Sequence, residues 1–190
     1  MTNTSELALR HHDADGMYQL RAPLLTVYTE VYADLLGDPF FTPERFWERL
    51  EAYAKWPGFA LVTGWLRDEL VGYTLGYRLP TRSAWWRGFR GDVDPQLLEE
   101  DGKRTFAVTQ LMVLPGWRRR GYARQLHDAL LRDRTEERAT LLVKPDNIPA
   151  RTTYLSWGWQ RFGQLQPFDD APVYESLMCE FSDRSHIIRL

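Results

Sequence analysis

Apolar side chains in the first half of the chain switch between a helical and a strand-like spacing. Residues 17–36 carry them every three or four positions, which predicts an amphipathic helix. Thr42 is a residue type that often caps a helix, and Pro43 is typical of the first helical position, so a second helix is expected to continue over 45–54. Three strand-like runs complete this half, the last two joined by a polar turn as a hairpin: 6–10, 59–66 and 70–77.

The second half alternates strands with helices after a long irregular connection over 80–103. Its helices are expected over 119–134 and 147–157, the second capped by an asparagine and ended by a glycine. The order of elements, β-α-α-β-β-β-α-β-α-β-β, predicts an α/β fold in which helices pack on one sheet. No repeat or linker divides the chain, so we expect one domain over 1–190. The strands of this half are expected at four apolar runs: 106–113, 139–143, 159–164 and 173–181.

The helix expected over 119–134 begins with an unusual charge pattern. Arg118, Arg119 and Arg120 stand at its start without any carboxylate, although the positive end of a helix dipole disfavours cations. A bound anion would explain the pattern, because first-turn amides point outward without helical partners and Gly121 allows close approach to the backbone. From these residues alone, a solvated basic helix start without a ligand is an equally good interpretation.

Composition narrows the class of protein. With 190 residues, 44 % apolar and 14 % aromatic side chains, the chain can bury a proper core. A net charge of −2 does not provide the excess of positive charge that binding to nucleic acid or an anionic membrane needs, so neither is expected as a partner. The single cysteine, Cys179, lies in an apolar run and is expected in the core. No spacing of His, Asp or Glu suggests a metal, and no histidine is assigned a role; His127 is expected near the polar side of its helix. The polar start and the lack of long apolar segments predict a cytoplasmic protein.

Two ordered motifs resemble those of the GNAT superfamily of N-acetyltransferases. The first, (Gln/Arg)-x-x-Gly-x-(Gly/Ala), is matched by Arg118, Gly121 and Ala123 after a strand. The resemblance covers about 106–181, followed by a tail over 182–190, whereas the first half agrees only in its element order. It implies a mixed, mostly antiparallel central sheet flanked by helices, with splayed central strands. The second motif, in VKPDNIPARTTYLSWGW, is matched at Asn147, Ala150, Tyr154, Gly158 and Trp159.

The resemblance implies that the chain binds acetyl-CoA as its acyl donor. The backbone of 111–113 would pair with the pantetheine arm, and the amides of 119–124 would hold the pyrophosphate. The side chains of 118–120 would add charge near the phosphates, while Asn147 would contact the cofactor arm, a role compatible with capping its helix. The residues implied to bind the cofactor are Leu111, Met112, Val113, Arg118, Arg119, Arg120, Gly121, Tyr122, Ala123, Arg124 and Asn147.

By the same resemblance, Tyr154 is the general acid, at the family's offset from Asn147. The chemistry calls for one, because coenzyme A leaves as a thiolate when an amine attacks the thioester. From the residues alone, Tyr154 could also be a core aromatic on the helix face that carries Ala150. Gln110 and Leu142 stand where many relatives carry the carboxylate that deprotonates the amine. Four other carboxylates are weaker candidates for the base: Glu30, Asp169, Asp170 and Glu175.

These observations predict an N-acetyltransferase that moves the acetyl group of acetyl-CoA to a primary amine without a metal. The acceptor, a small molecule or a protein amine, stays open, as does a homodimer. Two rival interpretations are a catalytically degenerate coenzyme A-binding fold with a regulatory role and a phosphate-binding module unrelated to coenzyme A. In the segment SAWWRGF, at least one tryptophan is expected to pack on the protein itself and the other to wall the acceptor site. The acceptor-side candidates are Gln110, Trp85, Trp86 and Glu30.

Overall fold

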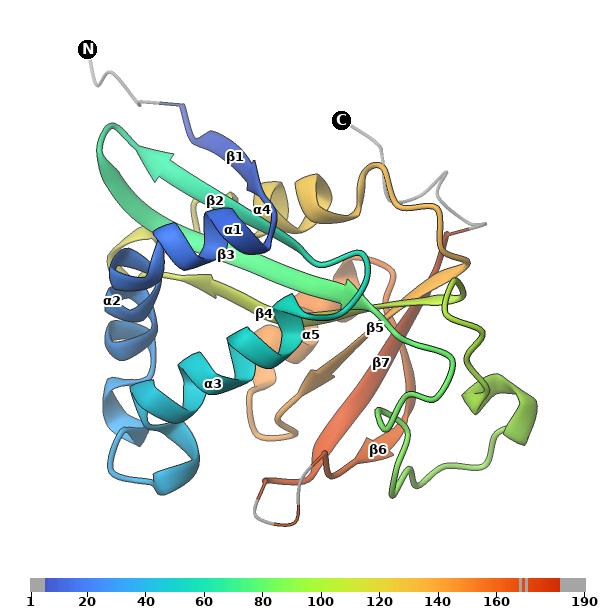
Figure 1. The fold of residues 1–190 in the computed structure, drawn as a ribbon. Coiled ribbons are helices and arrows are strands. Elements are labelled where there is room, and N and C mark those ends of the chain that lie inside the picture. Colours follow the sequence, from blue (N-terminus) through green and yellow to red (C-terminus); the bar gives the residue numbers. More distant parts are fainter. Residues whose placement is uncertain (1–5, 168, 170, 182–190) are drawn as a thin grey trace. The chain divides into compact units, whose positions relative to one another are not determined.

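The computed structural model describes residues 6–167, 169 and 171–181 (Figure 1). Seven strands form one mixed, open sheet in the order β1-β2-β3-β4-β5-β7-β6, which confirms the predicted α/β class. β4 and β5 are parallel, and the pairs β1–β2, β2–β3, β5–β7 and β6–β7 are antiparallel. Asp170 and the tail over 182–190 lie outside the described residues.

The chain divides into two compact units, which are described separately. Unit 1 comprises Met1–Tyr77 and Gln110–Arg134, and unit 2 comprises Arg78–Thr109 and Thr135–Leu190. One domain over 1–190 therefore stays a prediction. Within the described residues, no helix combines the length and apolar character that crossing a bilayer requires.

The helix predicted over 17–36 is wrong, because the chain forms two helices there. α1 ends before Leu20, and α2 follows with Pro23 in its first turn. Proline has no amide hydrogen to continue the helical bonding of α1, so the chain restarts instead of continuing straight. The N-cap prediction at Thr42 is confirmed, since its hydroxyl accepts from the Arg45 amide at 3.3 Å. The main elements of unit 1 are β1 (Ala8–His12), α1 (Ala14–Gln19), α2 (Arg21–Val31), α3 (Pro43–Ala54), β2 (Ala60–Leu66), β3 (Glu69–Arg78, its last residue in unit 2), the end of β4 (Thr105–Val113) and α4 (Tyr122–Leu131).

Helices cover both faces of the strands in unit 1. Side chains from α1, α2 and α3 pack with strand residues such as Leu61, Tyr73 and Leu75 in one apolar cluster. Alternation along β2 turns Gly64 to the other face, where its Cα hydrogens face Leu126 of α4. The middle of α4 therefore packs closely against β2.

Unit 2 is built on an antiparallel β5–β7–β6 ladder. β5 pairs with β7 from Arg138–Glu180 to Val143–Glu175, and it pairs in parallel with β4 from Thr105–Arg138 to Val108–Leu141. Cys179 of β7 is buried, as predicted. The elements of unit 2 are the start of β4, a 3₁₀ turn (Pro95–Leu98), β5 (Arg138–Val143), α5 (Ile148–Ser156), β6 (Gln160–Leu165) and β7 (Tyr174–Glu180).

Candidate functional site

The start of α4, in unit 1, has the backbone geometry of an anion site. Gly121 is the N-cap residue, with a left-handed φ of +82°, and no side chain caps the helix. The Gln125 amide, bonded to the Gly121 carbonyl at 3.1 Å, begins the helical hydrogen bonding. A Cβ on Gly121 would meet no atom within 4 Å, so the space beside this turn is open. The helix begins at Tyr122 and not at the predicted 119, because Arg119 (φ +59°) and Gly121 both leave the helical region.

The basic side chains around this turn contact different groups of unit 1. The Arg118 Nε donates to the Val113 carbonyl at 3.1 Å, and the Arg120 guanidinium lies 5.0 Å from the centre of the Trp117 ring. A carbonyl and a ring orient these cations but do not neutralise them. Arg124 instead forms an ion pair with Asp128, one turn later, at 2.7 Å. The positive charge near the helix start therefore resides mainly on 118–120.

Tyr122 and His127 are two of the buried side chains of α4. The role predicted for Tyr122 uses its backbone amide and does not depend on its ring. The expectation that His127 lies near the polar side is wrong, because only 1 % of its surface is exposed. His127 shares a face with buried Leu131, four residues on, since the buried side of α4 is wider than one apolar stripe. Burial lowers the pKa of His127, although its Nδ1 lies 2.8 Å from the Asp128 carboxylate, which opposes the shift.

The end of β4 is fixed on its β3 side. The Thr74 hydroxyl donates to the Gln110 carbonyl at 2.7 Å, and the Leu114 amide donates to the Val71 carbonyl at 2.9 Å. A Cβ on Gly72 would lie 2.5 Å from the Met112 carbonyl oxygen, so glycine permits this close approach. The segment predicted to meet the pantetheine arm, 111–113, thus has a well-defined backbone within unit 1.

α5, in unit 2, carries the second predicted motif. Asn147 is its N-cap, as predicted, and its Oδ1 accepts from the Ala150 amide at 3.2 Å. Tyr154 is half-buried, and its ring meets the rings of Trp157 and Trp159 edge-on, at 5.6 and 5.9 Å between centres. The helix ends at a glycine with φ +92°, as its sequence predicts. The packing fixes the Tyr154 ring and is compatible with both interpretations of this residue.

The candidate bases differ in their surroundings. Glu175 accepts from the Arg161 Nε at 2.9 Å and lies 3.7 Å from an Arg151 nitrogen, so two cations hold it as a structural carboxylate. Glu30 and Asp169 are exposed. Among the described residues, the metal-binding types His, Cys, Asp and Glu form no group of three that could hold a metal ion.

A buried hydroxyl not expected from the sequence lies beside Leu142. Ser176 of β7 pairs with Leu142 in the strand register, is fully buried, and has an Oγ without a hydrogen-bond partner among the described residues. The signal that could have identified it is its place in an apolar strand, which is buried at the four consecutive positions 176–179.

The segment SAWWRGF forms turns within the irregular connection expected over 80–103. Trp86 is buried and donates from Nε1 to the Glu100 carboxylate at 2.8 Å, which confirms that at least one tryptophan packs on the protein itself. Its ring packs with those of Phe89 and Phe162, at 5.9 and 5.5 Å between centres. Trp85 is half-buried, and whether it walls an acceptor site stays a prediction.

Comparisons with known proteins identify the family and the fold. The model of the acetyltransferase (GNAT) family matches residues 24–159. A search of curated protein sequences gives no match. Similar solved structures include an acetyltransferase from Thermus thermophilus, with 16 % identity, coverage of 92 % of this chain and 97 % of that one, and a TM-score of 0.62.

Two further structures contain coenzyme A. The PaiA N-acetyltransferase from Thermoplasma acidophilum, in complex with coenzyme A, is 8 % identical, with coverage of 93 % of this chain and 99 % of that one and a TM-score of 0.56. The aminoglycoside N-acetyltransferase AAC(6')-Iy, in complex with CoA, is 15 % identical, with coverage of 87 % and 95 % and a TM-score of 0.58. At these identities the likeness shows the fold.

Proposed function

The chain belongs to the GNAT family of acetyltransferases, and on this premise we propose that it transfers the acetyl group of acetyl-CoA to a primary amine. The observation that carries the proposal is the start of α4, where uncapped backbone, a left-handed glycine and three arginines occur together. Stability alone gives no reason for this combination, whereas a phosphate ligand does.

The groups at this turn fit the pyrophosphate of acetyl-CoA. The amides of Tyr122 and Ala123 lie in the first helical turn, and Gly121 leaves open space beside it. Arg119 and Arg120 would add charge-assisted hydrogen bonds. Arg118 would act mainly through Val113, because its bond to that carbonyl joins the loop to the strand end. The backbone of 111–113 would then bind the pantetheine arm and Asn147 would contact it, as the family resemblance implies.

Acetyl-CoA supplies the acetyl group as a reactive thioester. Tyr154 would donate a proton to the departing sulfur, because a phenol is a suitable acid for a thiolate. The aromatic contacts of Tyr154 with Trp157 and Trp159 are compatible with this role, since a ring with restricted motion presents its hydroxyl in one direction.

The described carboxylates considered as the base are either exposed, as Glu30 and Asp169 are, or held by cations, as Glu175 is. Gln110 and Leu142 cannot take a proton, and Glu175 is paired with two arginines. We therefore propose that the acceptor loses its proton to solvent or arrives neutral, so that the rate rises with pH until the amine is neutral. Free amines of lower pKa should then be better acceptors near neutral pH.

The test is the release of free thiol from acetyl-CoA across a panel of small primary amines and lysine-containing peptides. Thiol release that requires an amine, together with an acetylated product in mass spectrometry, supports the proposal. Acetyl-CoA binding without turnover on any amine would instead favour the regulatory coenzyme A-binding fold that the missing carboxylates make conceivable. Failure to bind acetyl-CoA would refute both.

A further inference from the structure

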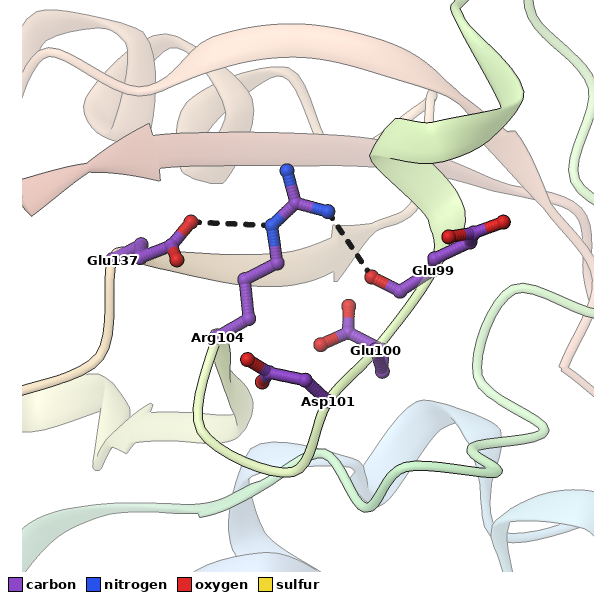
Figure 2. Close-up of a pocket in the computed structure, with 5 residues that line it drawn as sticks. All are labelled: Glu99, Glu100, Asp101, Arg104 and Glu137. Atoms are coloured by element: carbon purple, nitrogen blue, oxygen red, sulfur yellow. Dashed lines mark hydrogen bonds and ion pairs between the residues drawn. The ribbon is translucent and has the colours of Figure 1, made fainter.

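A cavity of about 310 Å³ lies in unit 2, and none of its lining residues is among those assigned above (Figure 2). It is near the first residue of β5, whereas α5 follows the opposite end of that strand. Four carboxylates and one guanidinium line it, so negative charge is in excess. The lining residues are Glu99, Glu100, Asp101, Arg104 and Glu137.

Glu100 provides the deepest acceptor in this cavity. Its side chain is only 2 % exposed, and Figure 2 shows its carboxylate directed toward Arg104 and Asp101. One oxygen, Oε1, accepts from Trp86 Nε1 at 2.8 Å, Thr105 Oγ1 at 2.8 Å and Arg138 Nη2 at 3.3 Å. The other oxygen, Oε2, is buried and has no hydrogen-bond partner among the described residues. A buried carboxylate oxygen of this kind is rarely left unpaired in a folded protein.

The two neighbouring arginines do not supply the missing donor. Arg104 donates from Nε to Glu137 at 3.2 Å and from Nη1 to the Gln96 and Glu99 carbonyls at 2.8 and 3.2 Å (Figure 2 draws the bonds to Glu137 and Glu99). Arg138 donates from Nη2 to the Leu97 carbonyl at 2.6 Å, in addition to Oε1. Both guanidinium groups therefore donate to other acceptors, and neither donates to Oε2.

We propose that this cavity binds the primary ammonium group of a small alkyl diamine. An ammonium is compact and has three donors, so one N–H would supply the donor that Oε2 lacks while the others bond the rim carboxylates Asp101 and Glu137. The excess of carboxylates over cations accommodates the second ammonium of the diamine. A metal ion fits less well, because no group of three metal-ligating side chains exists among the described residues. The site is independent of the proposed acetyl transfer and is tested without acetyl-CoA.

The Trp86 indole N–H reports directly on Glu100, to which it donates. The probe is 1,4-diaminobutane, and 1,4-butanediol is its uncharged control of the same length. In ¹H–¹⁵N spectra, with the indole signal assigned through Trp86→Phe, we expect the diamine to shift this signal saturably and to raise the melting temperature. The diol should do neither, and added salt should weaken the effect of the diamine.

Three variants locate the site. Glu100→Gln should weaken diamine binding by about tenfold or more, because it removes the deep charge. The Glu137 side chain is 68 % exposed, so Glu137→Gln should fold normally. This variant should weaken diamine binding severalfold, which keeps the test valid even if Glu100→Gln does not fold. Asp92→Asn, an exposed carboxylate of unit 2 outside the cavity, should bind like the wild type. The proposal is overturned if the diol acts like the diamine, if Glu137→Gln binds unchanged, or if no shift occurs, in which case Oε2 bonds buried water only.

Discussion

Substitution of Gly121 separates two reasons for a glycine at the start of α4. One is conformational, because its φ of +82° is a backbone conformation that most residues adopt only with strain. The other is the approach of phosphate groups to the first-turn amides. A Cβ at this position would meet no protein atom within 4 Å, so any side chain would project into open space. The two reasons therefore affect different measurements, unfolding and ligand affinity.

The conformational contribution is small and can be isolated. Gly121→Ala should lower the free energy of unfolding by about 1–2 kcal/mol, the strain of a left-handed alanine, with no new packing to offset it. Gly121→Asn should lose less, because asparagine tolerates this conformation. Urea unfolding measures both values, and Asn is thus the variant in which a side chain is added with the least strain.

The electrostatic contribution follows from comparing Gly121→Glu with Gly121→Gln, which have the same size. Two unit charges about 4 Å apart interact by about 4 kcal/mol at an effective dielectric constant of 20, and exposure to solvent reduces this value. We expect acetyl-CoA to bind Gly121→Glu about 10- to 100-fold more weakly than Gly121→Gln, or about 1.4–2.7 kcal/mol. Isothermal titration calorimetry measures both affinities. Equal affinities in the Glu and Gln variants would refute an anion site at this turn, whatever their stability.

Four further predictions test other residues. Tyr154→Phe should keep acetyl-CoA affinity and lower turnover by about 10²-fold; full activity across pH would make Tyr154 a packing residue. Gln110→Ala should change the KM of the amine more than it changes the dependence of activity on pH. If Gln110→Glu instead raises activity and shifts the acid side of that dependence, the position has catalytic geometry and lacks only its carboxylate. Trp86→Ala should lower the free energy of unfolding by about 3–5 kcal/mol, and Trp85→Ala should raise the amine KM with little loss of melting temperature; an unchanged KM would make this segment purely structural. Burial lowers the pKa of His127 below 6.5, so the unfolded chain binds a proton more readily than the folded one, and the free energy of unfolding should be full above pH 6.5 and fall below it. In urea unfolding from pH 7 to 5, this free energy should depend less on pH in His127→Gln than in the wild type. The same pH dependence in both proteins would contradict a buried, neutral His127.

The elements of the fold could be predicted because their signals are local. A strand or helix shows its period within about ten residues, and caps such as Thr42 and Asn147 stand next to the helices they begin. The failure in α1 and α2 was also local: Pro23 was visible in the sequence, but the apolar period on both sides of it favoured one helix. Periodicity describes which side faces the core and does not show whether the hydrogen bonding is continuous.

The candidate site was predictable only where its residues adjoin in the sequence. The segment 118–124 could be recognised because a helix start is one continuous piece of backbone. The depth of His127 could not, because it depends on how wide a face the strands beneath α4 cover. The pair formed by Glu100 and Arg138 lies 38 residues apart, and charged residues are ordinarily expected on the surface.

The two proposed sites have charge imbalances of opposite sign. Around the start of α4, cations occur without carboxylates in the first turn, where the helix dipole disfavours them. Around Glu100, carboxylates outnumber the cations that line the cavity, and one buried oxygen lacks a donor. The whole chain carries a net charge of only −2, so neither imbalance reflects its composition. Both proposals therefore rest on the same argument, that a ligand of opposite charge balances the local excess: phosphate at the first site and ammonium at the second.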